Sequence, residues 1–372
     1  MRPASNSHPG SGLTARRTGP IGLLLLTFVA AAVILGSPAR PATPEAPGAH
    51  AHAFLAGGQA VVTQLGSRGE HLLGRTSWQG HAFTASTGEA VTVYVSDLQA
   101  DVESIGQRWA DFFASLVHGS ELGGVTVYVV SPAEIAGICG DPRAIGCYGS
   151  SRLVIVGEPV AGVAPEEVAR HEYGHHVAAN RANPPWNAID WGPKRWASYA
   201  DVCGRVRRQT AFPGDESLRY PLNPGEAFAE SYRILNDQKA GATTFGWDIV
   251  DPSFYPDANA LQAVEQDVLQ QWAPPAPQTT RARFLRGGKT IWSLSLQTPL
   301  DGELAVTLTL PQGTLHDLAL LSADGRTVLA RGLWSGAAQK RLTYTICGER
   351  SLSLKVSRHG APGPFSIQVS HP

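Results

Sequence analysis

The sequence has little charge and a single methionine. Of its 372 residues 16% are charged, and 30 Lys and Arg against 31 Asp and Glu leave a formal net charge of -1. This balance excludes the strongly basic composition of a typical nucleic-acid-binding domain, so we expect no nucleic-acid partner. A hydrophobic content of 43% excludes a mainly disordered chain. The one methionine is Met1, so the interior has none to form a structural turn.

The N-terminal hydrophobic run, residues 21–36, is shorter than the roughly 20 residues that a membrane-spanning helix needs. Arginines without acids precede this run and small residues follow it, which is the layout of a secretory signal. We therefore expect residues 1–39 to be removed, leaving a secreted protein whose charge falls from -1 to -4 with the loss of three arginines. The alternative is a membrane anchor at residues 21–36, which would be the only membrane contact.

The chain has only four cysteines, and none of them shows the spacing of Cys-x-x-Cys metal ligands. In a secreted protein an even number of cysteines predicts disulfides, and four cysteines allow three pairings. We favour Cys139 with Cys147, which would close the short segment between them. The remaining pair, Cys203 with Cys347, would then tie two domains together.

A proline-rich stretch at residues 273–279 predicts a linker between two domains. Before it, residues 90–272 mix strand and helix patterns, with strands expected at 91–95, 125–130 and 153–156 and helices at 101–117 and 258–272. After it, residues 280–372 contain only short alternating segments separated by turns, which is typical of a β-sandwich. The predicted fold is thus an α+β domain followed by an all-β sandwich. Residues 40–89 remain open as a linker, a pro-segment or part of the fold.

A helix that begins at Pro165 and is ended by prolines 184 and 185 contains the pattern His-Glu-x-x-His. Residues four apart lie on one helical face, so His171 and His175 can bind one Zn²⁺. Glu172 lies beside them and can act as the general base on a water activated by the metal. The motif therefore predicts a zinc site that hydrolyses peptide bonds.

A catalytic zinc site needs a third protein ligand. The extended metzincin pattern would require Gly and His where this chain has Ala178 and Arg181, and its methionine turn is also missing. The best candidate lies on a second helix at residues 225–236, where Glu226 and Glu230 share one face. Glu226 would complete the ligand set and Glu230 would hold a ligand histidine.

Two simpler interpretations stand beside this hypothesis. Glu226, Glu230 and Arg233 could form a solvated helix face. His176 follows the motif but points about 100° away from His175, so it is expected to support a ligand or lie at the surface.

Together, HEYGHH and, about fifty residues later, EAFAESYR resemble the gluzincin metallopeptidases, in particular the branch typified by anthrax lethal factor and the Pro-Pro endopeptidases. The resemblance covers about residues 91–238. It implies a zincin-like fold in which Zn²⁺ is bound by His171, His175 and Glu226, with Glu172 as base and Glu230 in support. It also implies an oxyanion-stabilising tyrosine, for which Tyr220 is nearest and Tyr173 and Tyr232 are alternatives.

Residues 280–372, through Asp317, Leu318 and residues 365–369, resemble the pre-peptidase C-terminal domains of secreted bacterial proteases. That resemblance implies substrate or surface binding, inhibition before maturation, or stabilisation, without a choice among them.

The sequence as a whole predicts a secreted zinc endopeptidase that acts on protein or peptide substrates. The alternatives are a zinc hydrolase of other substrates and an exported surface-binding protein with a structural zinc site. Residues 153–156 are expected either to form a sheet edge that binds a peptide as an added strand or to be an ordinary core strand.

Overall fold

The computed structural model describes residues 61–74, 78–243, 247, 249–335 and 338–372. The predicted signal peptide and residues 40–60 lie outside this part of the chain. No helix in the described part is long and apolar enough to cross a membrane. Separate hydrophobic cores form on either side of the proline-rich stretch. We call residues 61–277 the α/β region and residues 278–372 the sandwich.

The α/β region is built on one mixed six-stranded sheet with the strand order β1-β5-β6-β4-β3-β2. The pairs β1/β5, β3/β4 and β4/β6 are parallel, whereas β2/β3 and β5/β6 are antiparallel. The strands are β1 (Val61–Gln64), β2 (Trp78–Thr84), β3 (Ala90–Ser96), β4 (Thr126–Val130), β5 (Ala144–Gly149) and β6 (Arg152–Val156).

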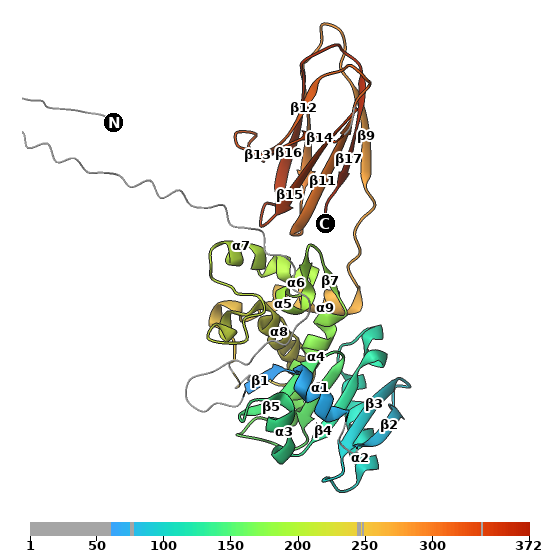
Figure 1. The fold of residues 1–372 in the computed structure, drawn as a ribbon, viewed down its shortest axis with the longest axis vertical. Helices are drawn as coiled ribbons and strands as arrows, with labels where there is room; N and C mark the ends of the chain where they lie inside the picture. Colours follow the sequence, from blue (N-terminus) through green and yellow to red (C-terminus); the bar gives the residue numbers. More distant parts are fainter. Residues whose placement is uncertain (1–60, 75–77, 244–246, 248, 336–337) are drawn as a thin grey trace, which may run out of the picture. The chain divides into compact units, whose positions relative to one another are not determined.

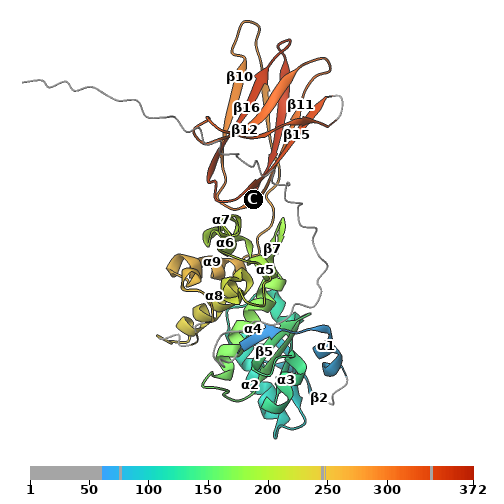
Figure 2. The ribbon, with the colours of Figure 1, turned by 60° about the vertical axis from the view of Figure 1, so that its left-hand side comes forward.

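Helices cover both faces of this sheet, which explains why its central strands are apolar throughout (Figures 1 and 2). In β6, Leu153 and Ile155 belong to the core under α2 and α4, while Val154 and Val156 belong to the core under α1 and α3. The helices are α1 (Ser67–Leu73), α2 (Val102–Ser115), α3 (Pro132–Cys139) and α4 (Pro165–Ala179).

Of the two alternatives for residues 153–156, the structure shows the ordinary core strand and not the sheet edge. Strand β6 pairs with β5 on one side and with β4 on the other, so its backbone groups are already hydrogen-bonded. An apolar run buried on both faces is the mark of an interior strand, and a peptide cannot add to it. The edges of the described sheet are β1 and β2.

Residues 61–74 and 78–84, which fall in the range that was left open as a linker, a pro-segment or part of the fold, are part of the fold. Strand β1 pairs with β5, and β2 pairs with β3. Leu65 and Leu73 are buried in the core beneath β5 and β6. Thr63 Oγ1 also donates to the carbonyl oxygen of Cys139 over 3.4 Å. This segment therefore supplies both edge strands of the sheet, β1 and β2.

A second layer of helices follows the sheet, and its central contact is between α4 and α8 (Figure 1). A Cβ atom at Gly174 would lie only 2.7 Å from the Cα of Ala229, so glycine is needed for this close approach. Asn223 caps α8 by accepting from the backbone N–H of Gly225 at 3.0 Å. The α-helices of this layer are α5 (Ala188–Trp191), α6 (Lys194–Tyr199), α7 (Val202–Arg207), α8 (Pro224–Lys239) and α9 (Ala258–Leu269).

The last 95 residues form two antiparallel sheets packed around an apolar core, as predicted for a β-sandwich. One sheet has the order β10-β16-β12-β13 and the other β14-β15-β11-β17-β9. Three short strands, β9, β13 and β14, were not predicted. The strands are β9 (Gln278–Arg283), β10 (Ile291–Gln297), β11 (Gly302–Thr309), β12 (His316–Ser322), β13 (Val328–Arg331), β14 (Leu333–Trp334), β15 (Gln339–Ile346), β16 (Ser351–Arg358) and β17 (Pro364–Ser370).

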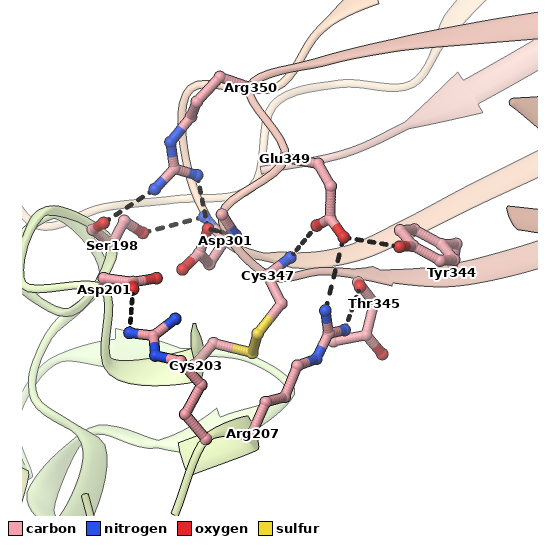
Figure 3. Close-up of a disulfide and its surroundings, with 12 residues drawn as sticks. Ser198, Asp201, Cys203, Arg207, Asp301, Tyr344, Thr345, Cys347, Glu349 and Arg350 are labelled. Carbon is pink, nitrogen blue, oxygen red and sulfur yellow. Dashed lines mark hydrogen bonds and ion pairs between the residues drawn. A yellow bond between two sulfur atoms is a disulfide. The ribbon is translucent and has the colours of Figure 1, made fainter. Parts of the chain in front are cut away.

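Both favoured disulfides are confirmed. Cys139 and Cys147 join the end of α3 to β5, and Cys203 and Cys347 join α7 to the sandwich. Around the second disulfide, Arg350 donates to the carboxylate of Asp301 and to the carbonyl oxygen of Ser198 (Figure 3). The covalent link between the two regions is therefore reinforced by polar contacts. Disulfides are typical of an extracellular or otherwise oxidising compartment.

Candidate metal centre

The two histidines of the motif lie on the buried face of α4. Pro165 occupies the first turn of the helix, where a proline costs no hydrogen bond. His171 and His175 are four residues apart and both are buried. Their Nε2 atoms approach to 3.2 Å, which places the two imidazole nitrogens at one point beside the helix.

Glu226 on α8 completes a three-residue group with these histidines. Its Oε2 atom lies 3.1 Å from Nε2 of His171 and 3.3 Å from Nε2 of His175. Glu226 follows the capped N-terminus of α8 by one turn, and the close packing of α4 on α8 brings it to the histidines. The alternative of a solvated Glu226, Glu230 and Arg233 face is wrong, because all three side chains are buried.

The three converging atoms fit a small cation. An ion with tetrahedral ligands at ~2.1 Å separates its ligand atoms by roughly 3.4 Å, close to the spacing seen here. Imidazole nitrogen and carboxylate oxygen are also ligand atoms that Zn²⁺ accepts. The group of His171, His175 and Glu226 can therefore hold a metal ion, although the residues alone do not fix which metal.

The electrostatics of the group also favour a cation. Burial acts to lower the pKa of His171, but the carboxylates of Glu226 and Glu230 outweigh it and raise this pKa to about 9. Burial acts to raise the pKa of Glu226, but the neighbouring histidines hold this pKa well below its usual range. In the absence of a cation these buried carboxylates thus favour a proton on His171, and a metal ion would take that place.

Glu172 lies beside the ligand group with both carboxylate oxygens buried and without a hydrogen-bond partner. Burial raises the pKa of its carboxyl group well above the ordinary value. A buried carboxylate without a partner is costly, so it marks a place where another group is expected. Glycine at position 146 makes the room, since a Cβ there would lie 2.8 Å from Oε1 of Glu172.

Glu230 supports the ligand histidine from behind. Its Oε2 atom lies 3.4 Å from Nδ1 of His171, the ring nitrogen opposite the ligand group. Arg233 donates to Glu230 over 2.9 Å and also pairs with Asp237. Hydrogen bonding of a carboxylate to the second ring nitrogen fixes the tautomer and orientation of a ligand histidine.

Of the three candidate tyrosines, only Tyr220 reaches the ligand group. Its hydroxyl donates to Oε2 of Glu226 at 2.7 Å. The hydroxyl of Tyr232 instead donates to the carbonyl oxygen of Val117, and that of Tyr173 to Glu121. Burial, with a further contribution from Glu226, raises the pKa of Tyr220 well above the ordinary value, so its hydroxyl remains a proton donor.

His176 is neither a ligand nor a surface residue. It is buried, with Nε2 2.9 Å from the carbonyl oxygen of Glu121 and Nδ1 3.1 Å from the hydroxyl of Tyr148. Tyr148 on β5 in turn stacks on His175 with ring centroids 6.4 Å apart. His176 therefore ties the motif helix to β5.

Two residues near the metal group were missed by the sequence analysis. Trp247 packs its ring edge-on against His171, with centroids 5.8 Å apart. Glu216 is buried, accepts from Asn223 at 2.8 Å, and has a pKa raised by burial and by Glu226. Both lie in irregular segments that have no periodic pattern, so only the folded chain brings them to the site.

Comparisons with known proteins give the chain no family. No protein-family model matches it, and no curated protein matches it. Among solved structures, the pre-peptidase C-terminal domain of a collagenase from Bacillus anthracis is similar at 14% identity, over 25% of this chain and 88% of that domain, with a TM-score of 0.22. The SPBc2 prophage-derived protein YomS is similar at 17% identity, over 27% of this chain and all of that one, with a TM-score of 0.18. TM-scores at this level assign neither a fold nor a family.

Proposed function

We propose that the chain is a secreted zinc-dependent endopeptidase with a zincin-like α/β region. The observation that carries the proposal is the position of Glu172. Both of its carboxylate oxygens are buried without a hydrogen-bond partner, and its carboxyl group interacts electrostatically with His171 and Glu226, two of the three residues of the metal group. A general base held beside a metal group is what metal-assisted hydrolysis requires.

The metal would be held by His171, His175 and Glu226, and bound Zn²⁺ supplies an acidified water and polarises a substrate carbonyl. Glu172 takes a proton from the attacking water and returns it to the leaving amine of the peptide. A bound cation would favour the carboxylate form of Glu172 that accepts this proton, and burial of the carboxyl group favours holding the proton until it is passed on.

Tyr220 would act on the oxygen of the scissile carbonyl as negative charge develops there. Its hydroxyl already lies at the ligand group through its bond to Glu226. A buried donor aimed at developing charge stabilises the transition state more than the substrate. Glu230, held by Arg233, keeps the ring of His171 in place during the reaction.

A purely structural zinc site is the main competing interpretation. Structural sites are closed by four protein ligands, whereas catalytic sites use three and leave one position open. Among the described residues the group contains three candidate ligands, His171, His175 and Glu226, which favours the catalytic interpretation. No specific observation favours a non-protein substrate over a peptide.

The test is cleavage of an unstructured protein with and without a chelator, using wild type and Glu172→Gln. The variant is expected to keep zinc in stoichiometric amount but to lose about 10²–10⁴ in rate, the usual contribution of a general base. Glu166→Gln, on the first turn of the same helix, is the matched control and is expected to retain the wild-type rate. Zinc-loaded protein without chelator-sensitive cleavage would contradict the proposal.

A further inference from the structure

The near-neutral chain consists of two regions of opposite charge. The α/β region has 15 Lys and Arg against 25 Asp and Glu, a formal net charge of -10. The sandwich has 11 Lys and Arg against five Asp and Glu, a formal net charge of +6. A basic domain within a neutral chain is an electrostatic footprint for an anionic partner.

Three loops meet at one end of the sandwich, and we call them the sandwich tip: residues 284–290, 310–315 and 359–363. The antiparallel register places them at the end opposite residue 347 of the disulfide (Figures 1 and 2). They are hydrogen-bonded to strand β16 and to one another. The guanidinium of Arg358 donates to the carbonyl oxygen of Leu285 at 2.9 Å. The backbone N–H of His359 donates to the carbonyl oxygen of Leu315 at 2.9 Å.

The tip exposes large aliphatic side chains. Leu285 is 65% exposed and Leu315 is 59% exposed, and Ile291, the residue that follows the first loop, is 49% exposed. The backbone of this group is tied together by Arg358, whose N–H also donates to the carbonyl oxygen of Thr290 at 2.8 Å. Aliphatic residues gathered at one end of a soluble fold, rather than scattered singly, mark an interaction site.

The charges at the tip are all of one sign. Its three loops contain no Asp or Glu, and Arg286 and Lys289 are exposed without an ion pair among the described residues. Asp317, two residues after the second loop, is paired with Lys340 at 2.8 Å and with His359 at 2.7 Å. The tip thus combines exposed aliphatic residues with two cations, Arg286 and Lys289, that have no acidic partner among the described residues.

We propose that the sandwich tip docks on a bilayer surface that contains anionic lipids. Leu285, Leu315 and Ile291 enter the boundary between headgroups and acyl chains, and Arg286 and Lys289 pair with lipid phosphates. A soluble polyanion would satisfy the cations but would leave the aliphatic side chains in water, so the combination favours a lipid surface. This inference is independent of the proposed peptidase activity.

The test is sedimentation of the full chain with vesicles of phosphatidylglycerol and phosphatidylcholine, and with phosphatidylcholine alone. Binding is expected to prefer the anionic vesicles and to weaken as salt is raised. Leu285→Ser with Leu315→Ser is expected to reduce the affinity about tenfold or more, because the inserted apolar area is lost. Arg286→Gln with Lys289→Gln is expected to reduce it by about tenfold and to flatten the salt dependence.

Matched controls test whether the same substitutions reduce vesicle binding when they are made away from the tip. Leu98→Ser with Leu269→Ser changes two leucines of similar exposure, 67% and 57%, in the α/β region. Arg68→Gln with Arg108→Gln makes the same change in net charge there. The N-terminal apolar run is present in every variant, so it contributes equally to each. Both controls are expected to bind within about twofold of wild type, since they leave the inserted groups intact.

A local measurement checks that the tip itself makes the contact. All four cysteines are in disulfides, so Gly288→Cys introduces one thiol for an environment-sensitive fluorophore on the first loop. Its emission is expected to shift to the blue on anionic vesicles, while the same label at Gly123 is unchanged. Three results would overturn the proposal: no difference between tip and control variants, equal binding to inorganic polyphosphate that the leucine variant leaves unchanged, or self-association in place of vesicle binding.

Discussion

The α/β region buries the charged groups of its metal site, whereas the sandwich exposes most of its cations. In the α/β region the charged residues of the metal group, including Glu172, Glu230 and Arg233, are buried in the helical layer. The sandwich core is formed by aliphatic and aromatic side chains, and most of its cations are exposed. Burying a charge is expensive unless it is paired, so a fold keeps such groups where their chemistry is needed.

This difference separates two kinds of evidence for function. A buried carboxylate without a partner, as in Glu172, indicates chemistry inside the fold. Exposed aliphatic residues next to unpaired cations, as at Leu285 and Arg286, indicate a partner outside it. The two proposals thus rest on different regions and can fail separately.

The largest expected effect is the loss of folding stability when the disulfide that joins the two regions is removed. Cys203 and Cys347 are 144 residues apart, whereas Cys139 and Cys147 are eight apart. By the loop-entropy relation the long link stabilises the fold by about 5 kcal/mol and the short one by about 2.5 kcal/mol. Cys203→Ser with Cys347→Ser should therefore destabilise the protein about twice as much as Cys139→Ser with Cys147→Ser.

The measurement is denaturant unfolding followed by tryptophan fluorescence, with both double variants compared at the same protein concentration. Removal of the long link is also expected to split unfolding into two transitions, because each region has its own core. A single transition with equal loss of stability in both variants would show that the polar contacts around Asp301 and Arg350 hold the regions together without the disulfide.

The sequence predicted the parts of the molecule that local patterns encode. The helix with His171, Glu172 and His175 has a proline start and a fixed four-residue spacing, and both disulfides follow from cysteine positions and export. The ligand partner Glu226 was predicted because it shares a helical face with Glu230. The structure brings these residues together through the close packing at Gly174 and Ala229.

What the sequence could not supply depends on contacts between distant segments. Strand β5 contains glycines at 146 and 149 and was not predicted as a strand, although it pairs on both sides. The interior position of β6 follows from that pairing and not from its own residues. Trp247 and Glu216 reach the metal group from irregular segments, whose paths no periodicity describes.

A smaller effect, within the α/β region, is expected from Tyr220→Phe. Loss of one donor to a developing oxyanion costs about 10²-fold in kcat. The change leaves His171, His175 and Glu226 intact, so zinc content should stay at the wild-type level. The comparison is between initial rates of cleavage and zinc bound per chain.

Tyr232→Phe and Tyr173→Phe are the matched controls, because their hydroxyls bond to Val117 and Glu121 and not to the ligand group. Both should keep the wild-type kcat. An equal loss of rate in all three variants would mean that Tyr220 acts through the stability of the fold and not on the substrate.

The smallest effect concerns the pH dependence of stability. Glu121 is buried, and burial acts to raise the pKa of its carboxyl group. The N–H of Gly119 and the guanidinium of Arg181 each donate to this carboxylate at 2.7 Å. These two contacts outweigh the effect of burial, so the pKa of Glu121 is lowered. A folded pKa below the unfolded one means that Glu121 stabilises the fold above the unfolded pKa, near pH 4.5, and that this stability is lost as pH falls through the folded pKa.

Unfolding free energies of metal-free wild type and Glu121→Gln, measured from neutral pH downward, should therefore converge below about pH 4.5. Glu303→Gln is the control from the sandwich, since Glu303 is exposed and has no ion pair among the described residues. This variant keeps the buried pair of Glu121 and Arg181, so it should keep the acid sensitivity of wild type. If Glu121→Gln and Glu303→Gln showed the same pH dependence of the unfolding free energy, the acid sensitivity would not come from the buried charge of Glu121. The two regions would then not differ in how their charged groups affect stability.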